Sequence, residues 1–518
     1  MKKCYISFFF VLCLFVLTNE LSAQRVVKVT QGVGTLNSTI NGDTTAFGTR
    51  KDPDTIYELD KGGYYVTMGT IENKNYHLRI RAAAGTGKRP IIRPGVVSGG
   101  SSSRPFSLSG NLTLDGVYVT NLDEQNGIKQ YVFQIATDNL KLTILNSHID
   151  REGQIVVRCD GKNSSVIIKN SIISNVGTMA SASNGRGVDD RGTDMDTLIF
   201  ENNTFYNLTS RIIRDGGGII KYCRVNHNTV VNVGQMGCTF GPVIKGYFTN
   251  NLFFNTSFLG QDTTRTATID YTFQTNVLPK TWLDQGFVQK IEIHHNNLYV
   301  SPEIVSSLLT LTKGRKASTV FSPHADSIIT ANGWKSTNTN LPISFKTPPQ
   351  VPLQVMKDYW NTAVTVKPEL DPGTGSPDYG KTQMPFDFSY PTTSSFYTAG
   401  TSNQPLGDLN WFGMTVGVTN NENVLPKEYQ LYSNYPNPFN PTTNIRYSLP
   451  VAGNVKIEIF NTLGQLVKTV VDQHQNPGSH NVVWNGIDKS GQQVSTGVYI
   501  YKLTTNNFTS AKKMILIK

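Results

Sequence analysis

The 518-residue sequence is poor in the side chains on which several common kinds of site depend. Charged residues make up only 16% of the chain, and cysteine occurs five times. Beyond the N-terminal segment the cysteines are Cys159, Cys223 and Cys238. Their spacing matches no metal site, and their odd number argues against a disulfide framework. We interpret them as small buried hydrophobic residues. The sequence also has no Ser/His/Asp motif and no phosphate-binding loop, which leaves a triad hydrolase and a P-loop enzyme without support.

Long apolar runs are also scarce, and the one that suggests export lies at the N-terminus. Residues 6–17 are apolar and follow Lys2 and Lys3, and residues 21–23 (Leu-Ser-Ala) form an acceptable cleavage site. The run is too short to span a bilayer as a lone helix. We therefore predict a signal peptide over residues 1–23. The mature protein should then be secreted or attached to the outer-membrane surface, with no transmembrane segment.

The charge balance favours an anionic partner. The formal net charge is +10, and it falls to +9 without the predicted signal peptide, which holds two lysines and one glutamate. A basic protein outside the cytoplasm rarely meets nucleic acid, so we expect an anionic polysaccharide or cell surface as the partner and no nucleic acid. The alternative, that the charge affects only solubility, stays open.

An internal repeat is the most informative feature of the rest of the chain. One pattern recurs along the sequence. It consists of two apolar residues two positions apart and, two positions after the second, a polar residue that we call the anchor. Such alternation is typical of strands with one buried face. Successive anchors are 23 to 32 residues apart, and the last step of 45 is about two turns. A repeat of about 24 residues with several short strands predicts a parallel β-helix. The anchors are Asn146, Asn170, Asn202, His227, Asn250 and His295.

Asparagine and serine recur at fixed offsets from these anchors. Stacked asparagine side chains can hydrogen-bond to one another and to the turn backbone, and asparagine tolerates left-handed dihedral angles. We interpret the two columns as turn-stabilising ladders in preference to ligands for sugar or metal. One position after the anchors stand Ser147, Ser171, Asn203, Asn228, Asn251 and Asn296, and five positions after them stand Asn175, Asn207, Asn232 and Asn255.

Three upstream segments carry a resemblance to a known superfamily. They are Gly62-Gly-Tyr-Tyr65, the turn of residues 82–90 (Ala-Ala-Ala-Gly-Thr-Gly-Lys-Arg-Pro) and residues 112–117 (Leu-Thr-Leu-Asp-Gly-Val). They resemble the first coils of right-handed β-helix proteins, and more narrowly the pectate-lyase-like and chondroitinase-B-like superfamily. The resemblance implies an all-β fold with a right-handed parallel β-helix over residues 24–345. Residues 346–412 resemble the segment that closes such a helix, and residues 413–424 have the polar composition of a linker.

The C-terminal residues 425–518 have a different pattern. Short alternating strands separated by turns predict a small immunoglobulin-like β-sandwich. Residues 434–441 (Asn-Tyr-Pro-Asn-Pro-Phe-Asn-Pro), the turns at 461–464 and 495–499, and the Lys-Lys-Met of 512–514 closely resemble C-terminal sorting domains of the type IX secretion system. The resemblance implies that the type IX translocon is a partner and that the module is usually cleaved on export. An ordinary adhesive immunoglobulin-like domain is the alternative.

A charged cluster in the repeat region is the candidate site. The segment 186–192 (Arg-Gly-Val-Asp-Asp-Arg-Gly) is echoed 25 residues later by 211–217 (Arg-Ile-Ile-Arg-Asp-Gly-Gly). Because this offset is one coil, we predict that Arg186 lies near Arg211 and that Asp190 lies near Asp215, with Arg158 and Asp160 one coil earlier. Such a basic groove with embedded carboxylates would suit a uronic-acid polymer. The alternative is a set of salt-bridged ladders between neighbouring coils.

The superfamily resemblance implies a reaction for such a groove. Lyases of this superfamily cleave uronic-acid polymers by β-elimination: Ca²⁺ or Arg neutralises the uronate carboxylate, and Lys or Arg abstracts the C5 proton. On this basis Arg191 and Arg214 are catalytic candidates, and Arg158, Arg186 and Arg211 are substrate-binding candidates. The candidate Ca²⁺ ligands are Asp189, Asp190 and Asp215, and further candidates for the base are Lys221, Lys245 and His227.

Three functions stay open at this point: a polysaccharide lyase, a non-catalytic carbohydrate-binding or adhesive β-helix, and a glycoside hydrolase. A hydrolase needs two carboxyl groups roughly 5 to 10 Å apart, which Asp190 and Asp215 could supply. The sequence has no clear Asp-Asp/Arg-Pro-Arg arrangement of the pectate-lyase type, and the Lys-and-Arg catalytic pair of the superfamily cannot be placed. We expect a monomer.

Overall fold

The computed structural model divides the chain into two compact units, residues 1–415 and residues 416–518. The predicted signal peptide and most of the predicted linker lie outside the described part of the chain. The structure describes residues 24–45, 50–96, 104–125, 127–262, 271–311, 315–367, 369–370, 386–414, 429–432, 434, 437–475 and 478–517.

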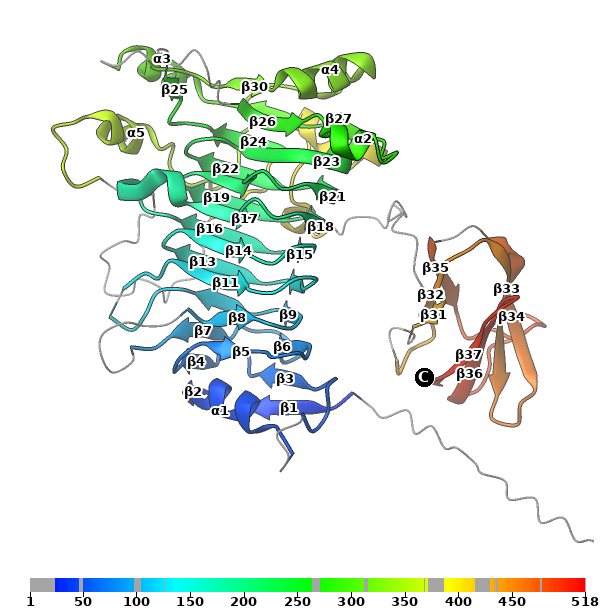
Figure 1. The fold of residues 1–518 in the computed structure, drawn as a ribbon. Helices are drawn as coiled ribbons and strands as arrows, with labels where there is room; N and C mark the ends of the chain where they lie inside the picture. Colours follow the sequence, from blue (N-terminus) through cyan, green and yellow to red (C-terminus); the bar gives the residue numbers. More distant parts are fainter. Residues whose placement is uncertain are drawn as a thin grey trace, which may run out of the picture. The chain divides into compact units, whose positions relative to one another are not determined.

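The first unit is a parallel β-helix with three faces, which rises coil by coil from its N-terminal end (Figure 1). Face 1 consists of β1 (Val26–Val29), β3 (Ile56–Leu59), β6 (Leu78–Ala82), β9 (Leu112–Asp115), β12 (Lys141–Leu145), β15 (Ser164–Lys169), β18 (Met195–Glu201), β21 (Ile220–Asn226), β23 (Cys238–Thr249) and β27 (Lys290–His294). Face 2 consists of β2 (Gly32–Val33), β4 (Tyr64–Thr67), β7 (Ile91–Pro94), β10 (Tyr118–Thr120), β13 (His148–Glu152), β16 (Ile172–Val176), β19 (Thr204–Leu208), β22 (Thr229–Val233), β24 (Leu252–Thr256) and β28 (Asn297–Tyr299). Face 3 consists of β5 (Ile71–Glu72), β8 (Phe106–Leu108), β11 (Tyr131–Ile135), β14 (Ile155–Cys159), β17 (Arg186–Asp189), β20 (Arg211–Arg214), the first residues of β23, β26 (Tyr271–Asn276) and β30 (Thr319–Phe321).

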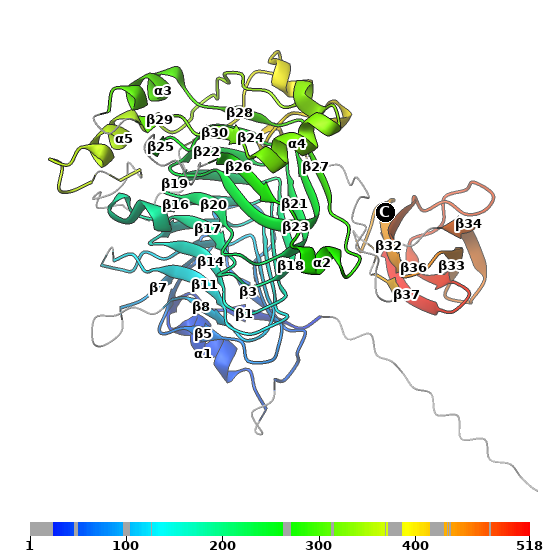
Figure 2. The ribbon, with the colours of Figure 1, turned by 45° about the horizontal axis from the view of Figure 1, so that its top comes forward.

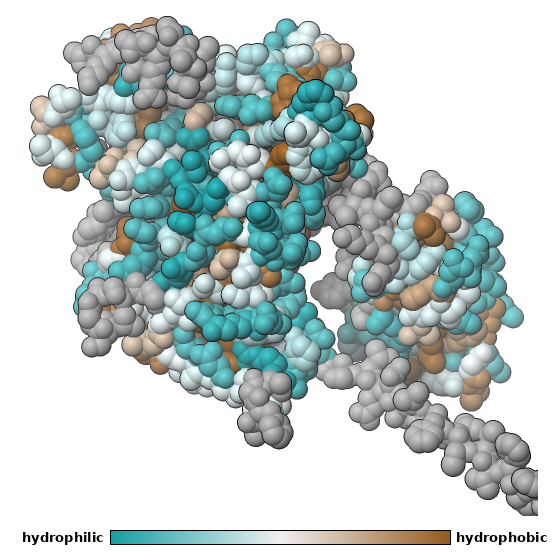
Figure 3. Space-filling model, viewed as in Figure 1, coloured by the Kyte–Doolittle hydropathy of each residue, from teal (hydrophilic) through white to brown (hydrophobic). Residues whose placement is uncertain are grey.

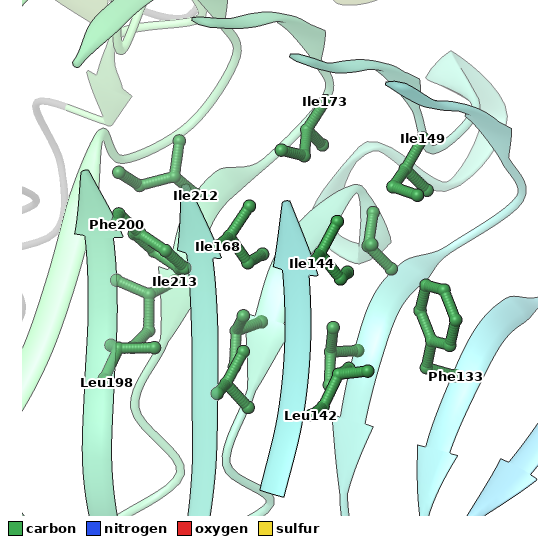
Figure 4. Packing of buried hydrophobic residues seen from close by; sticks show 14 of the residues in the cluster. Phe133, Leu142, Ile144, Ile149, Ile168, Ile173, Leu198, Phe200, Ile212 and Ile213 are labelled. Atoms are coloured by element: carbon green, nitrogen blue, oxygen red, sulfur yellow. The ribbon is translucent and has the colours of Figure 1, made fainter. Parts of the chain in front are cut away.

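The three faces, which Figure 2 shows from a second side, enclose an interior of buried apolar side chains. Alternation along each strand turns every second side chain inward, and the parallel register stacks equivalent residues of successive coils. Burying one such aliphatic or aromatic side chain stabilises the fold by about 1.5–3 kcal/mol. The β-helix that the repeat predicts is thereby confirmed. Figure 4 shows part of this stack, in which Ile144 of β12 lies in register with Ile168 of β15 and with Phe200 of β18.

The asparagine column between faces 1 and 2 is an interior hydrogen-bonded ladder. Asn203 Nδ2 donates to Asn228 Oδ1, Asn228 Nδ2 to Asn251 Oδ1 and Asn251 Nδ2 to Asn296 Oδ1, at 3.0, 3.0 and 2.9 Å. The anchor that precedes each rung has a left-handed backbone, with φ between 50° and 62°. These contacts confirm the structural interpretation of this column.

Short helices close both ends of the β-helix. At the N-terminal end, α1 (Thr35–Gly42) buries Leu36 and Ile40 against the first coil. At the other end, α4 (Pro323–Ala331) begins with Ser322, whose side chain accepts a hydrogen bond from the Ala325 amide, and it places Ala325 and Ile329 in the core. The helices therefore cover strand edges and apolar interior at both ends. No helix in the described ranges is long and apolar enough to cross a bilayer.

The remaining elements of the first unit pack on its outside. Phe388, Tyr390, Phe396 and Leu406 contact outward-facing residues of face 2 such as Tyr206, Val231 and Leu252. Another apolar cluster joins residues of η1, α3 and α5. These outer elements are η1 (Met179–Asn184), β25 (Gln261–Asp262), α2 (Lys280–Leu283), α3 (Pro302–Leu309), β29 (Arg315–Lys316), η2 (Trp334–Thr337), α5 (Leu353–Trp360), η3 (Ser395–Thr398), η4 (Thr401–Asn403) and η5 (Leu409–Phe412).

The second unit is an immunoglobulin-like sandwich of two antiparallel sheets, as the sequence predicts. Its core includes Trp484, Tyr501 and Ile457. One sheet contains β31 (Gln430–Leu431), β32 (Thr443–Leu449) and β35 (Gly478–Trp484), and the other contains β33 (Gly453–Asn461), β34 (Leu466–Gln475), β36 (Gly497–Thr504) and β37 (Thr509–Leu516).

Candidate functional site

Face 3 brings the predicted arginines together on the outside of adjacent coils. In the parallel register Arg186 of β17 pairs with Arg211 of β20, and Asp189 pairs with Arg158 on one side and Arg214 on the other. Paired residues of neighbouring strands are about 4.8 Å apart along the helix axis. The predicted proximity of Arg186 and Arg211 is therefore confirmed. We call Arg158, Arg186, Arg191, Arg211 and Arg214 the arginine patch, and Figure 3 shows hydrophilic residues gathered over these middle coils.

Asp189 is the organising residue of the patch. Its carboxylate is fully buried and lies 2.6 Å from Arg186 Nη1, 3.1 Å from Arg214 Nη1 and 3.7 Å from Arg191 Nη1. The side chains of Arg191 and Arg214 are still 38% and 32% exposed. One buried anion thus holds three guanidinium groups in place and leaves two of them accessible to a ligand.

The patch continues one coil toward the N-terminus through a second ion pair. Arg158 Nε donates to both carboxylate oxygens of Asp160, at 3.0 and 2.9 Å, and Gln134 Nε2 donates to the same carboxylate. The Arg158 guanidinium also lies 5.6 Å from the centre of the Tyr131 ring, and the Arg104 guanidinium lies 4.6 Å from the centre of the same ring. Arg104, Tyr131 and Gln134 were not among the residues predicted from the sequence. The repeat could have placed two of them, since Tyr131 and Gln134 precede Ile155 and Arg158 by 24 residues, one coil.

Neutral groups orient Arg211, the member of the patch on β20 that pairs with Arg186. It donates to Ser210 Oγ at 3.2 Å, Thr239 Oγ1 at 3.3 Å and Gln235 Oε1 at 3.4 Å. These contacts hold the guanidinium group beside the rest of the patch. The five arginines outnumber the four neighbouring carboxyl groups of residues 160, 189, 190 and 215, so the patch is positively charged.

Asp190 lies beside the patch but contacts different groups. It directly follows the last residue of β17, and its side chain is fully buried. Its Oδ1 accepts hydrogen bonds from the amides of Gly192 and Gly216, at 2.9 and 2.5 Å. Its Oδ2 is buried and accepts no hydrogen bond from the described residues.

Asp215 follows Arg214, so it is the neighbour of Asp190 on the next coil, and the Asp190 amide donates to the Arg214 carbonyl at 3.4 Å. Burial, and then the charge of Asp215, raise the pKa of Asp190 to about 7. Burial also raises the pKa of Asp215. The predicted proximity of the two aspartates is confirmed.

The three aspartates do not fit a calcium site. Asp189 is surrounded by arginines, Asp190 uses one oxygen for backbone amides, and the described residues include no group of three or more His, Cys, Asp or Glu side chains that could hold a metal ion. Calcium requires six to eight oxygen ligands, several of them ionised. We derive no step through a metal.

The further candidates for a base lie elsewhere. Lys221 is on β21 and Lys245 on β23, both in face 1. Lys221 Nζ donates to Asn163 Oδ1 at 3.1 Å. His227 is buried, and burial lowers its pKa to about 4. The structure therefore brings none of these three into the arginine patch.

The buried position of Asp189 leads to a stability prediction. We expect Asp189→Asn to lower the free energy of unfolding by about 1–3 kcal/mol, since it leaves three guanidinium groups facing a neutral amide. Urea unfolding of the full chain measures the change. Asp160→Asn is the matched control and should cost less than about 1 kcal/mol, because its side chain is 27% exposed. Equal losses in the two variants would show that Asp189 has no organising role.

Two family models match parts of the chain. The model described as FlgD Ig-like domain matches residues 441–508, and the model described as Disaggregatase related matches residues 108–218. The second range includes every member of the arginine patch. Each match covers less than half of the chain, and no curated protein matches.

Three solved structures share short likenesses with the chain. Dimeric latent PorU from Porphyromonas gingivalis is 22% identical over 18% of this chain and 10% of its own, with a TM-score of 0.16. PorZ, described as an essential surface component of the type IX secretion system of the same organism, is 21% identical over 17% and 11%, with a TM-score of 0.13. FlgD from P. aeruginosa is 26% identical over 14% of this chain and 59% of its own, with a TM-score of 0.13. The chain thus spans about a tenth of the length of the first two proteins, and these likenesses carry no argument about activity.

Proposed function

We propose that the β-helix binds an anionic polysaccharide of the uronic-acid class through the arginine patch, outside the cell. The observation that carries the proposal is the row of guanidinium groups on three adjacent coils, three of which contact one buried carboxylate. Arginine pairs with carboxylates through two parallel hydrogen bonds, which gives both affinity and orientation. A repeating cationic surface suits a ligand that is itself a repeating polyanion.

The geometry supports binding better than proton abstraction by arginine. Arg191 and Arg214 both contact the Asp189 carboxylate, at 3.7 and 3.1 Å, and an arginine in such a pair stays protonated. A protonated guanidinium group can neutralise a uronate carboxylate but cannot take a proton from C5. Cleavage by β-elimination with these residues as catalysts stays a prediction, and a non-catalytic carbohydrate-binding protein is the interpretation we favour.

A panel of polymers tests the proposal. Electrophoretic retardation of the full chain in gels containing polygalacturonate, alginate, chondroitin sulfate or neutral pullulan should show binding to at least one anionic polymer and none to pullulan. The same incubations, followed by absorbance of the unsaturated product, report lyase activity. Retardation by pullulan alone, or by no polymer, would contradict the proposal.

We further propose that the second unit directs export by the type IX system. The support is the sequence signature of residues 434–441, part of which contacts the last strand of the module. The backbone of Phe439 exchanges hydrogen bonds of 2.9 Å with residues 515 and 517, and Asn437 Oδ1 accepts a hydrogen bond from the Ile515 amide. The signature thus fixes the end of the last strand.

Truncation tests the export proposal. In a bacterium with a type IX system, we expect the full chain to reach the surface or medium, and we expect a chain that ends at Thr415 to stay in the periplasm. The isolated β-helix should keep its thermal transition, because the two units have separate hydrophobic cores. Export of the truncated chain at the level of the full chain would favour the adhesive alternative.

A further inference from the structure

Asp190 and Asp215 form a feature that polymer binding by the arginine patch does not explain. A buried carboxylate normally finds a cation or several donors, because an isolated buried charge is costly. Asp190 has two amide donors on Oδ1, but its Oδ2 is buried and has no donor among the described residues. The register of β17 and β20 makes Asp215 the neighbour of Asp190 on the next coil. A proton shared by the two carboxyl groups would convert an unfavourable approach of like charges into a hydrogen bond.

Glycine residues make room for this arrangement. A side chain at Gly241, on the next coil, would place its Cβ 2.6 Å from the Asp215 carboxyl group. A Cβ at Gly216 would lie 2.8 Å from Asp190 Oδ1 and 2.4 Å from the Gly192 amide nitrogen. The space occupied by the two carboxyl groups therefore depends on glycine at successive coils.

The surrounding charged and titratable groups do not supply a competing partner for Oδ2. Arg214 faces Asp215 and interacts favourably with its ionised form. Cys159 faces Asp190 from the coil before, and burial raises the pKa of that thiol, so it stays neutral. Arg191 and Asp160 belong to the same turn region and attract each other. Asp189 is already occupied by the patch arginines.

We propose that Asp190 and Asp215 hold one proton between them, and that loss of this proton weakens binding of polyanions to the neighbouring arginine patch. Below the titration point the pair carries one negative charge, and above it the pair carries two. The added charge lies next to Arg214 and lowers the positive potential there. The second half of the proposal rests on the proposed function, whereas the first half does not.

The sign of the pH effect follows from the raised pKa values. The pKa of Asp190 is about 7, so the shared proton is present at pH 6 and largely lost at pH 8.5. The affinity for polygalacturonate should therefore fall about three- to tenfold between these two pH values. By linkage, bound polyanion should hold the proton more tightly, so binding near pH 7.5 should take up protons from the buffer.

Infrared spectroscopy tests the proton pair without a ligand. Asp408 also has its pKa raised to about 7, and burial raises the pKa of Glu152, so spectra of variants must be subtracted from those of the wild type. We expect Asp190→Asn to remove one protonated-carboxyl band that titrates near pH 7. Asp196→Asn, which alters an exposed carboxylate on β18, should remove none. Identical bands in the wild type and in Asp190→Asn would overturn the proposal.

Calorimetric titration with polygalacturonate tests the coupling. The amide that Asp190→Asn introduces would donate to an ionised Asp215, so the variant pair carries one negative charge at every pH. The variant should therefore bind at pH 8.5 as tightly as the wild type binds at pH 6, with no pH dependence. Gly241→Ala keeps every charge, displaces Asp215, and should move the midpoint of the pH dependence to lower pH even if Asp190→Asn does not fold. Unchanged pH dependence in both variants would overturn the coupling. Absence of binding at both pH values, with the infrared band intact, would sink the proposed function and leave the proton pair standing.

Discussion

Replacing Arg191 and Arg214 together by alanine should weaken the binding of polygalacturonate about a hundredfold. These two members of the patch are the most exposed of the three that contact Asp189, with 38% and 32% of their side chains accessible. A hydrogen bond to a charged group contributes about 1.5–3 kcal/mol, and each 1.4 kcal/mol is a factor of ten in affinity. Isothermal titration calorimetry at pH 6 and low salt measures the loss.

Two controls make this result specific to the patch. Lysine at both positions keeps the charge but loses the paired hydrogen bonds, so it should recover only part of the affinity. Alanine at Arg79 and Arg81 of face 1 removes the same charge from side chains of similar exposure, 24% and 40%, and should change binding less than about threefold. Equal losses in the two double-alanine variants would show that the ligand responds only to net charge.

Asn228→Leu should destabilise the β-helix by about 3–5 kcal/mol. The side chain is fully buried in the middle of the ladder. Its Oδ1 accepts from the amide and the side chain of Asn203, and its Nδ2 donates to the Phe200 carbonyl at 2.9 Å and to Asn251 at 3.0 Å. Leucine is similar in size but leaves these buried donors and acceptors unpaired, at about 1–3 kcal/mol for each group.

Urea unfolding of the full chain measures this loss, read on the transition of the first unit. Asn338→Leu is the control, since it removes the last rung, which is only partly buried and has one neighbour in the ladder, Asn296. We expect about 1–2 kcal/mol there. If the two variants were equally stable, the ladder would not be a cooperative structural element.

Much of the fold could be predicted because a solenoid translates sequence spacing into position. Equivalent residues of successive coils stack, so an offset of 25 residues was enough to place Arg186 beside Arg211 and Asp190 beside Asp215. The ladder followed from the same spacing. The helices that close the two ends, α1 and α4, were not predicted. They lie outside the repeat, and each has too few apolar residues to show a helical period in the sequence.

The roles of the three aspartates could not be predicted from spacing. In the sequence, Asp189, Asp190 and Asp215 were equivalent candidates for calcium ligands. The structure separates them, because the Asp189 carboxylate contacts arginine side chains, while Asp190 accepts hydrogen bonds from backbone amides and has one buried oxygen with no donor among the described residues. Which face of a strand a residue occupies depends on the register of that coil, and which arginines converge on a carboxylate depends on side-chain packing. Neither is encoded in a local motif.

Hydrogen–deuterium exchange of the full chain, with and without oligogalacturonate, tests the central claim most directly. We predict slower exchange in residues 155–160, 186–192 and 211–217, the parts of three adjacent coils that carry the arginine patch, and unchanged exchange in the second unit. Protection confined to face 1 or to the second unit, with these three segments unaffected, would contradict the claim.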